Sequence, residues 1–347
     1  MASFTSNDET KILLGMGNPL LDISAEVPAS VLEKYEVQAG NAVLAEAKHL
    51  PVYQDLVENH QPVQYIAGGA TLNSIRVAQW MVGEAGKSGY FGCVGKDEYG
   101  NTMESCAAAD GVNVMFQKTE EEATGTCAVL VVESERSLIA NLAAANKFTP
   151  AHLEGAETKA FYESAGVYYI AGFFLTVSVD SILTIGRHAA ENSKPFCMNL
   201  SAPFLVQFFK EQMAACLPYC DFVFGNESEA ATLGQEKGWG ENLSEIALKL
   251  AAEPKASGTF PRTVVFTQGS EKTIVAQNGV VTEFPVEPLA RELLVDTNGA
   301  GDAFVGGFLS QLMKGKPIAE CVRAGHWGAR VIIQRSGCTF PEECDFE

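Results

Sequence analysis

The chain has 347 residues, of which 47% are hydrophobic and 19% are charged, a composition typical of globular proteins and unlike that of disordered chains. This length accommodates a large α/β domain with an appended subdomain. The formal net charge of -19 opposes binding to nucleic acids and to anionic membrane surfaces, so we expect neither as a partner.

The nine cysteines have no regular spacing, and the nearest pair, Cys216 and Cys220, lacks the spacing of a zinc site. We therefore expect reduced thiols in a cytoplasmic protein without a structural metal, and leave entry into the nucleus open. Residues 1–10 are polar and acidic, and no segment has the apolar length that a bilayer requires. We expect neither an export signal nor a membrane anchor.

The first part of the chain alternates apolar runs with glycine-rich breaks. Its predicted elements are a strand over 11–16, a break at 17–19, a strand ending at 69, and helices over 71–82 and 98–110. Residues 112–140 contain three β-prone pieces with no helix between them that could cross over a sheet. Together with parts of 18–41, they predict a small antiparallel insert.

The second part of the chain alternates strands and helices more regularly. Strands are predicted over 167–171, 196–200, 222–224, 263–267 and 273–276, and helices over 179–190, 204–216, 299–313 and 318–333. This alternation predicts an α/β fold with a central, mainly parallel sheet that is covered by helices on both faces.

The segment Gly299-Ala300-Gly301-Asp302 opens the helix predicted over 299–313. Its small residues would let a phosphate approach the free backbone N–H groups at the positive end of the helix dipole. Asn298 is the expected N-cap. A carboxylate at Asp302 would lie beside the bound phosphoryl group and could accept a proton from an attacking hydroxyl. The alternative role of Asp302 is to stabilise the helix dipole.

This glycine-rich segment also carries a family resemblance. Asp296–Phe304 resembles the C-terminal signature of the ribokinase family of sugar and nucleoside kinases, in which the Asp at the position of Asp302 is the catalytic base. Gly68-Gly69 with Asn73 resembles the family's diglycine motif, and Gly92–Gly100 is also similar. Within the family, members that phosphorylate adenosine are the most similar, on segments 17–22, 137–146, 198–204 and 337–341. The resemblance covers nearly the whole chain.

The resemblance implies a ribokinase-like three-layer α/β/α sandwich with a small, discontinuous, β-rich lid. The expected large α/β domain comprises residues 1–17, 42–62, 70–111 and 146–347, and the expected lid comprises 18–41, 63–69 and 112–145. The implied substrates are ATP and adenosine, with Mg²⁺ accompanying ATP, and the protein is expected to be a monomer.

The resemblance also assigns residues to the nucleoside. Asp22, Gly68, Gly69 and Asn73 are expected at the ribose, Asn18 and Gln38 at the edge of the base, and Phe174 and Phe204 at the adenine ring. Core packing is the alternative for both Phe residues, and an ordinary turn is the alternative for Asp22. Ala70 stands where many of these kinases carry Ser, so a hydroxyl contact is absent there.

The remaining assignments concern the phosphates. Gly299, Ala300, Gly301 and Asp302 are expected to hold the phosphoryl group, and Asn199, Asn226, Glu229, Thr267, Gln268, Gly269, Asn298 and His326 are expected on the ATP side. Asn226 and Glu229 would organise Mg²⁺ through water, and can cap a helix at the same time. Arg136, in the charged turn 133–136, is expected to be a lid residue that neutralises the phosphoryl charge; a solvated surface charge is its alternative.

Two nucleotide-binding patterns are incomplete. Gly86-Lys87-Ser88 lacks the first glycine of a P-loop, and Gly15-Met16-Gly17 lacks the third glycine of a dinucleotide fingerprint. Three alternatives remain beside the expected activity. They are a kinase for a free sugar or another nucleoside, a nucleoside-binding regulator without catalysis, and a nicotinamide oxidoreductase, which the missing fingerprint disfavours.

Overall fold

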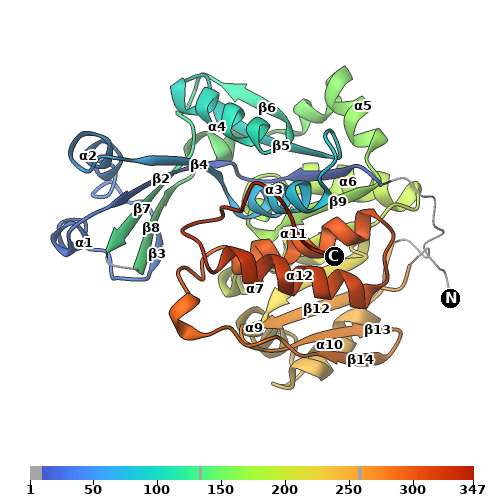
Figure 1. Ribbon diagram of the computed structural model, residues 1–347. Helices are drawn as coiled ribbons and strands as arrows, with labels where there is room; N and C mark the ends of the chain where they lie inside the picture. The colour runs from blue at the N-terminus through green and yellow to red at the C-terminus, as the bar shows by residue number, and fades with distance from the viewer. Residues whose placement is uncertain (1–9, 133–134, 257–259) are drawn as a thin grey trace.

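The computed structural model describes residues 10–132, 135–256 and 260–347. Its strands form a nine-stranded sheet and a five-stranded sheet, which projects from the main body together with α1 and α2 (Figure 1). In spatial order, the larger sheet contains β14 (Val280–Phe284), β13 (Glu271–Gln277), β12 (Thr263–Gln268), β11 (Phe222–Asn226), β10 (Phe196–Asn199), β9 (Val167–Ala171), β1 (Leu13–Met16), β5 (Ser88–Gly95) and β6 (Asn113–Thr119).

The larger sheet is parallel from β12 to β6, and β13 and β14 add an antiparallel edge. Strands β1, β5 and β9 are buried along their whole length, as expected for a parallel sheet covered on both faces. Successive residues point to opposite sides, so Leu13 and Leu14 of β1 belong to different core clusters.

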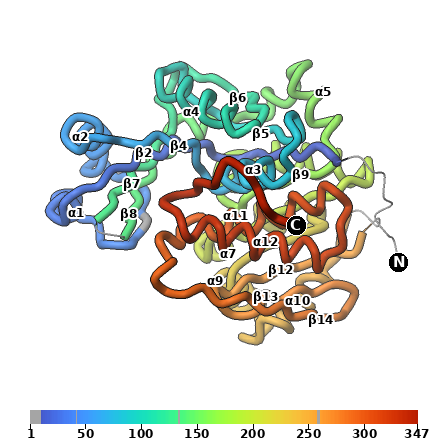
Figure 2. Tube along the Cα trace, in the orientation of Figure 1, coloured from blue at the N-terminus to red at the C-terminus, as the bar shows by residue number. Residues whose placement is uncertain are grey.

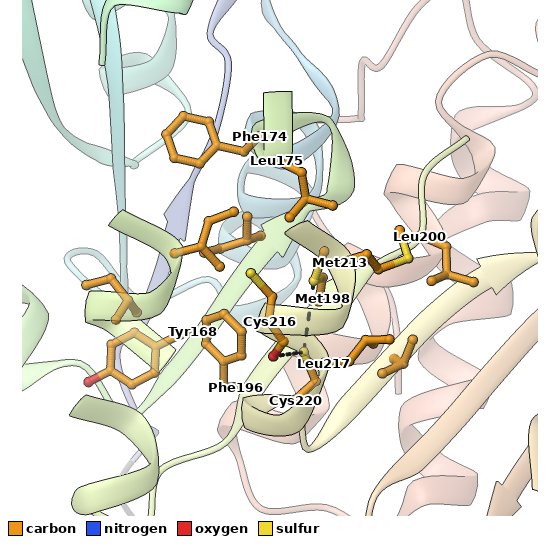
Figure 3. Packing of buried hydrophobic residues seen from close by; sticks show 14 of the residues in the cluster. Tyr168, Phe174, Leu175, Phe196, Met198, Leu200, Met213, Cys216, Leu217 and Cys220 are labelled. Atoms are coloured by element: carbon orange, nitrogen blue, oxygen red, sulfur yellow. Dashed lines mark hydrogen bonds between the residues drawn. The ribbon is translucent and has the colours of Figure 1, made fainter. Parts of the chain in front are cut away.

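Helices cover both faces of this sheet. One face packs against α5 (Ala156–Ser164), α6 (Val179–Glu191), α8 (Lys210–Cys216), α9 (Glu227–Lys237) and α10 (Leu243–Ala252). The other packs against α3 (Ala70–Val82), α4 (Glu98–Ala109), α11 (Ala300–Met313) and α12 (Ile318–Ile332). Figure 3 shows the first core, where Tyr168 and Phe196 pack near Cys216 and Cys220. The predicted three-layer α/β/α sandwich is confirmed.

The smaller sheet has the order β3 (Ala42–Leu44), β8 (Glu135–Asn141), β7 (Thr126–Val132), β2 (Leu20–Glu26) and β4 (Gln64–Gly68). Helices α1 (Ala29–Lys34) and α2 (Val52–Asn59) pack against it and enclose a separate hydrophobic cluster. The hydroxyl of Tyr53 in α2 donates a hydrogen bond to the carbonyl of Ile139 at 2.9 Å. The Cα trace shows this unit standing beside the larger body (Figure 2).

The segments of the two sheets differ from the expected lid boundaries. Residues 113–119 pair in parallel with β5, because α4 supplies the crossover that precedes them. Conversely, β3 pairs with β8 and α2 packs on the smaller sheet, although 42–62 was expected in the large domain. Only β7 and β8 of the insert expected over 112–140 pair antiparallel with each other.

The helix expected over 204–216 is divided into α7 (Pro203–Phe208) and α8, with Phe209 in a non-helical conformation between them. Short 3-10 helices span Ala143–Lys147, Pro150–Glu154, Gly172–Thr176, Leu217–Tyr219 and Arg291–Leu293. Within the described part of the chain, no helix combines the length and apolar character needed to cross a membrane.

Candidate active site

A cavity of about 170 Å³ lies at the carboxyl ends of the central strands. Asn199 at the end of β10, Asn226 at the end of β11 and Thr267 of β12 line it from the sheet. Gly301 and Asp302 in the first turn of α11 line it from the helix layer. Ligands of open α/β sheets bind at this edge, so the fold and the cavity agree on the position of the site.

The N-terminus of α11 is the segment for which the sequence predicts anion binding. Gly299 is the N-cap in a left-handed conformation, with φ 80°, and no side chain caps the helix. The Ala300 N–H donates to the Thr297 carbonyl at 3.2 Å, which leaves the N–H groups of Gly299, Gly301 and Asp302 available to a ligand. A Cβ placed at Gly301 would meet no atom within 4 Å, so the space beside this turn is open. The expected N-cap, Asn298, lies one residue before the observed N-cap, and its backbone N–H donates to Asp296 Oδ1 at 2.9 Å.

Asp302 is half-buried at this turn, and its Oδ2 accepts a hydrogen bond from Asn73 Nδ2 at 3.0 Å. Burial raises the pKa of Asp302 to about 7; the Asn73 hydrogen bond opposes this shift and the negative charge of Glu229 adds to it. A general base works best with a pKa near the working pH. The raised pKa of Asp302 is in the range that a general base would require.

Asp22 on β2 provides a second half-buried carboxylate. Burial raises the pKa of Asp22 to about 7, although the cations of Arg76 and Arg136 lower it. Gly68 lies against this carboxylate, since a Cβ there would come within 2.7 Å of Asp22 Oδ2. The glycine at this position lets the carboxylate lie directly on the backbone of the diglycine turn.

Two amide oxygens near these carboxylates lack partners. Asn18 Oδ1 and Asn73 Oδ1 are buried, and neither accepts a hydrogen bond within the described residues. An unpaired buried polar atom is costly, and a ligand that donates a hydrogen bond to it would remove that cost. Both residues were expected at the nucleoside.

Arg136 lies on β8 and is 7% exposed, so it is not a solvated surface charge. Its Nε lies 3.1 Å from Asp296 Oδ2, and its guanidinium donates to Ser336 Oγ. Asp296 also accepts a hydrogen bond from the backbone N–H of Gly337 at 3.0 Å. The small sheet is therefore joined to the segment that precedes α11. Glu133 and Ser134 of the charged turn lie outside the described residues.

Asn226 and Glu229 form the capping box of α9. Glu229 Oε2 accepts from the Asn226 backbone N–H at 2.9 Å, and Asn226 Oδ1 accepts from the Glu229 backbone N–H at 2.9 Å. Glu229 is 4% exposed, and burial raises its pKa to about 7. The capping role is confirmed, and both side chains also line the cavity. Among the described residues, no three His, Cys, Asp or Glu side chains gather as a direct metal site.

The other residues expected on the ATP side are spread along the same edge. Asn199 Oδ1 accepts from the Ser201 backbone N–H at 2.9 Å. Gln268 lies outside the cavity, and its side chain donates to the Lys272 carbonyl. His326 bonds to Thr273 Oγ1 at 2.8 Å, and burial lowers its pKa. Gly269, in the turn after β12, has a positive φ of 56°.

The aromatic expectations need correction. Phe174 is 1% exposed and packs in the core, with its ring centroid 5.4 Å from that of Phe148, so it does not face the cavity. Its neighbour Phe173 lines the cavity instead, with its ring 6.3 Å from that of Phe204. Phe204 is 40% exposed, which rules out plain core packing. Within the 3-10 helix Gly172–Thr176, two adjacent rings point in different directions, and the sequence pattern does not distinguish them.

Gln38 also differs from its expected place. Its residue is exposed beyond α1, and its backbone carbonyl accepts from Ser137 Oγ at 3.2 Å. The side chain does not line the cavity.

The comparisons with known proteins agree with this geometry. Residues 40–344 match the model of the pfkB family of carbohydrate kinases, and the chain belongs to that family. It is an ATP-dependent phosphotransferase.

The chain is also similar to individual proteins over nearly its full length. The chain is 56% identical to adenosine kinase 1 of Arabidopsis thaliana, over 98% of this chain and 99% of that protein. It is 48% identical to the adenosine kinase of Dictyostelium discoideum, over 95% and 96% of the two chains. The crystal structure of Anopheles gambiae adenosine kinase in complex with P1,P4-di(adenosine-5) tetraphosphate is 50% identical, has a TM-score of 0.89, and aligns over 96% of this chain and 99% of that one.

Proposed function

We propose that the chain transfers the γ-phosphoryl group of ATP to the 5′-hydroxyl of adenosine, giving AMP and ADP. The observation that carries this proposal is Asp302, a carboxyl group with a pKa of about 7 in the first turn of α11, beside the open N–H groups expected to bind phosphate. The identity to adenosine kinases over almost the full chain supports adenosine as the acceptor.

The nucleoside would lie between the two sheets. Asp22 accepts hydrogen bonds from the paired ribose hydroxyls, and the unpaired Oδ1 atoms of Asn18 and Asn73 accept further donors. Phe173 and Phe204 offer ring surfaces to the base. A solved structure of Schistosoma mansoni adenosine kinase in complex with adenosine, 38% identical with a TM-score of 0.88 over 96% of this chain, supports a site of this kind in this fold.

The phosphates would lie along α11. The N–H groups of Gly299, Gly301 and Asp302 receive the phosphoryl oxygens, and the Arg136 guanidinium offsets the charge that develops. Mg²⁺ arrives with ATP as part of the substrate. Asn226 and Glu229 would hold it through water, because their own atoms already form the capping box and magnesium usually retains several waters.

In the chemical step, these groups supply the proton acceptor, the attacking oxygen and the leaving group. Asp302 takes the proton of the 5′-hydroxyl as that oxygen forms its bond to the γ-phosphorus, and the bond from this phosphorus to the bridging oxygen of ADP breaks. The Asn73 hydrogen bond orients the Asp302 carboxylate. Enclosure by the small sheet excludes water, which is a competing acceptor.

The substrate test compares phosphorylation of adenosine, inosine, guanosine, ribose and fructose by labelled ATP with magnesium present. We expect adenosine to have a much higher kcat/KM than ribose, because the base contributes contacts that a free sugar cannot make. Similar values for adenosine and ribose would instead favour a sugar kinase. Tight adenosine binding without turnover would favour the non-catalytic regulator.

The diglycine turn gives a second test. Gly69 has φ 98° and ψ 135°, a region almost restricted to glycine, and a Cβ there would collide with the carbonyl oxygen of Asn18. We expect Gly69→Ala to weaken adenosine binding more than about tenfold, because the collision displaces Asn18 and the start of β2, and to cost about 1–3 kcal/mol of stability.

Gly83→Ala is the matched control for that substitution. Gly83 lies at the other end of α3 with φ 73°, and a Cβ there meets nothing within 4 Å. It should lower the thermal midpoint slightly without changing adenosine affinity, as measured by calorimetry. Equal affinities for Gly69→Ala and the wild type would remove the turn from the nucleoside site.

We also propose that the enzyme acts as a monomer in the cytoplasm. Its nine cysteines are free thiols, which suits a reducing compartment. Gel filtration with light scattering tests the first point, and localisation of the tagged protein tests the second.

A further inference from the structure

Arg76 is a buried cation that has no part in the chemical step described above. It belongs to α3, is 4% exposed, and donates from Nε to Asp110 Oδ2 at 2.6 Å. Its Nη1 donates to the carbonyls of Ala67 at 2.8 Å and Cys338 at 3.1 Å. One guanidinium therefore joins three segments that are distant in the sequence.

Two of these segments, and helix α3 itself, lead to a site residue. Ala67 precedes the diglycine turn, where Gly68 lies against the Asp22 carboxylate. Cys338 follows Gly337, whose N–H donates to Asp296, the partner of Arg136. Helix α3 itself carries Asn73, three residues before Arg76, and Asn73 donates to Asp302.

We propose that Arg76 is a positioning residue for the nucleoside and phosphoryl sites: by holding the Ala67 and Cys338 carbonyls together, it fixes the diglycine turn against the turn that binds Asp296 and Arg136. This inference rests on the proposed function, because it concerns the same site. Arg76 does not touch the substrate.

The charge of Arg76 has a separate, measurable consequence. The charged groups that act on Asp22 are Arg76 on α3, Arg136 on β8, Asp302 on α11, and Asp296. Two thiols, those of Cys127 on β7 and Cys338, lie close to it as well. Since the cation of Arg76 favours the ionised form of Asp22, its removal raises the pKa of Asp22 further. The proposed ribose contact uses the ionised form of Asp22. In a variant that lacks the Arg76 cation, the rise of adenosine affinity with pH should therefore occur at a higher pH than in the wild type.

The test measures the adenosine Kd by calorimetry as a function of pH, together with kcat and the thermal midpoint. For Arg76→Met, we expect the pH midpoint of adenosine binding to move up by about one pH unit and the affinity at neutral pH to fall about tenfold, with a smaller fall in kcat. Arg76→Lys keeps the charge, so its midpoint should stay at the wild-type value.

Arg262 supplies the matched control. It is also buried and donates to five backbone carbonyls, those of Leu217, Cys220, Leu250, Glu253 and Pro254. Arg262→Lys should lower the thermal midpoint and leave the pH dependence of binding unchanged. A purely structural role for Arg76 predicts the same result for Arg76→Met and would overturn the proposal.

Asp110→Asn keeps the inference testable if Arg76→Met does not fold. It leaves the charge and the carbonyl bonds of Arg76 but removes the ion pair that anchors its Nε, so adenosine affinity should fall a few-fold while the pH midpoint stays at the wild-type value, because Asp110 is not among the charged groups that act on Asp22. Unchanged adenosine affinity in Asp110→Asn would contradict the inference. A wild-type protein that neither binds nor phosphorylates adenosine would refute the proposed function itself, a result distinct from unshifted variants of an active enzyme.

Discussion

Asp302→Asn is expected to slow phosphoryl transfer roughly 10²–10⁴-fold while leaving adenosine binding nearly unchanged. Asn keeps the shape of the side chain and can still accept the Asn73 hydrogen bond, but it cannot take the proton of the 5′-hydroxyl. The ribose and base contacts lie on other residues. Single-turnover transfer and equilibrium adenosine binding, measured side by side, test this expectation.

Asp302→Asn is also expected to stabilise the folded protein above neutral pH, although it slows phosphoryl transfer. The pKa of Asp302 is raised from 3.8 to about 7, so the folded protein binds this proton more tightly than the unfolded chain does. Its stabilising contribution is complete below about pH 4 and is lost as the pH rises through about 7. Asn carries no charge to bury. Asp302→Asn should therefore raise the thermal midpoint at about pH 8 and change it little at low pH.

Asp180→Asn is a matched control, because Asp180 is an exposed carboxylate in the first turn of α6. If Asp302 served only to stabilise a helix dipole, both variants would lose a little stability and keep their activity. A near wild-type single-turnover rate in Asp302→Asn would show that Asp302 is not the base.

Arg136→Met is expected to lower turnover roughly 10²–10³-fold and adenosine affinity less than tenfold. A guanidinium near the phosphoryl group contributes most when charge develops in the transition state. In the structure, this guanidinium is paired with Asp296, which is buried. Removing one partner of a buried ion pair is strongly destabilising, so the thermal midpoint should fall as well. Steady-state kinetics with thermal unfolding separates these two effects.

Ser336→Ala provides the comparison for Arg136. It removes one hydrogen bond that docks Arg136 but leaves the cation and Asp296 in place. We expect a change of only a few-fold in turnover. Equal, small losses in both variants would mean that Arg136 merely fastens the small sheet to the main body.

The sequence predicts the site best where local backbone chemistry determines it. The glycine-rich start of α11, the diglycine turn and the capping box of Asn226 and Glu229 are each properties of a few adjacent residues. The alternation of strands and helices likewise predicts the parallel sheet. These features are also the ones that the structure reproduces with little change.

Features that depend on distant segments could not be predicted in this way. Arg136 pairs with Asp296, which lies 160 positions later in the chain (296 − 136). No local sequence pattern indicates this pairing. The choice between Phe173 and Phe174 depends on how one short 3-10 helix is oriented. The sequence pattern places β6 in the insert predicted over 112–140, because its crossover helix, α4, precedes those residues.

The most direct test of the account is the pH dependence of single-turnover transfer from ATP to saturating adenosine, measured from about pH 5.5 to about pH 9. The wild-type rate should rise with pH and level off, with a midpoint near the Asp302 pKa of about 7. Asp302→Asn should be slow throughout and lack this rise, whereas any ionisation of ATP itself would appear in both proteins. A wild-type rate that is independent of pH, or the same rise in Asp302→Asn, would contradict the assignment of Asp302 as the base that activates adenosine.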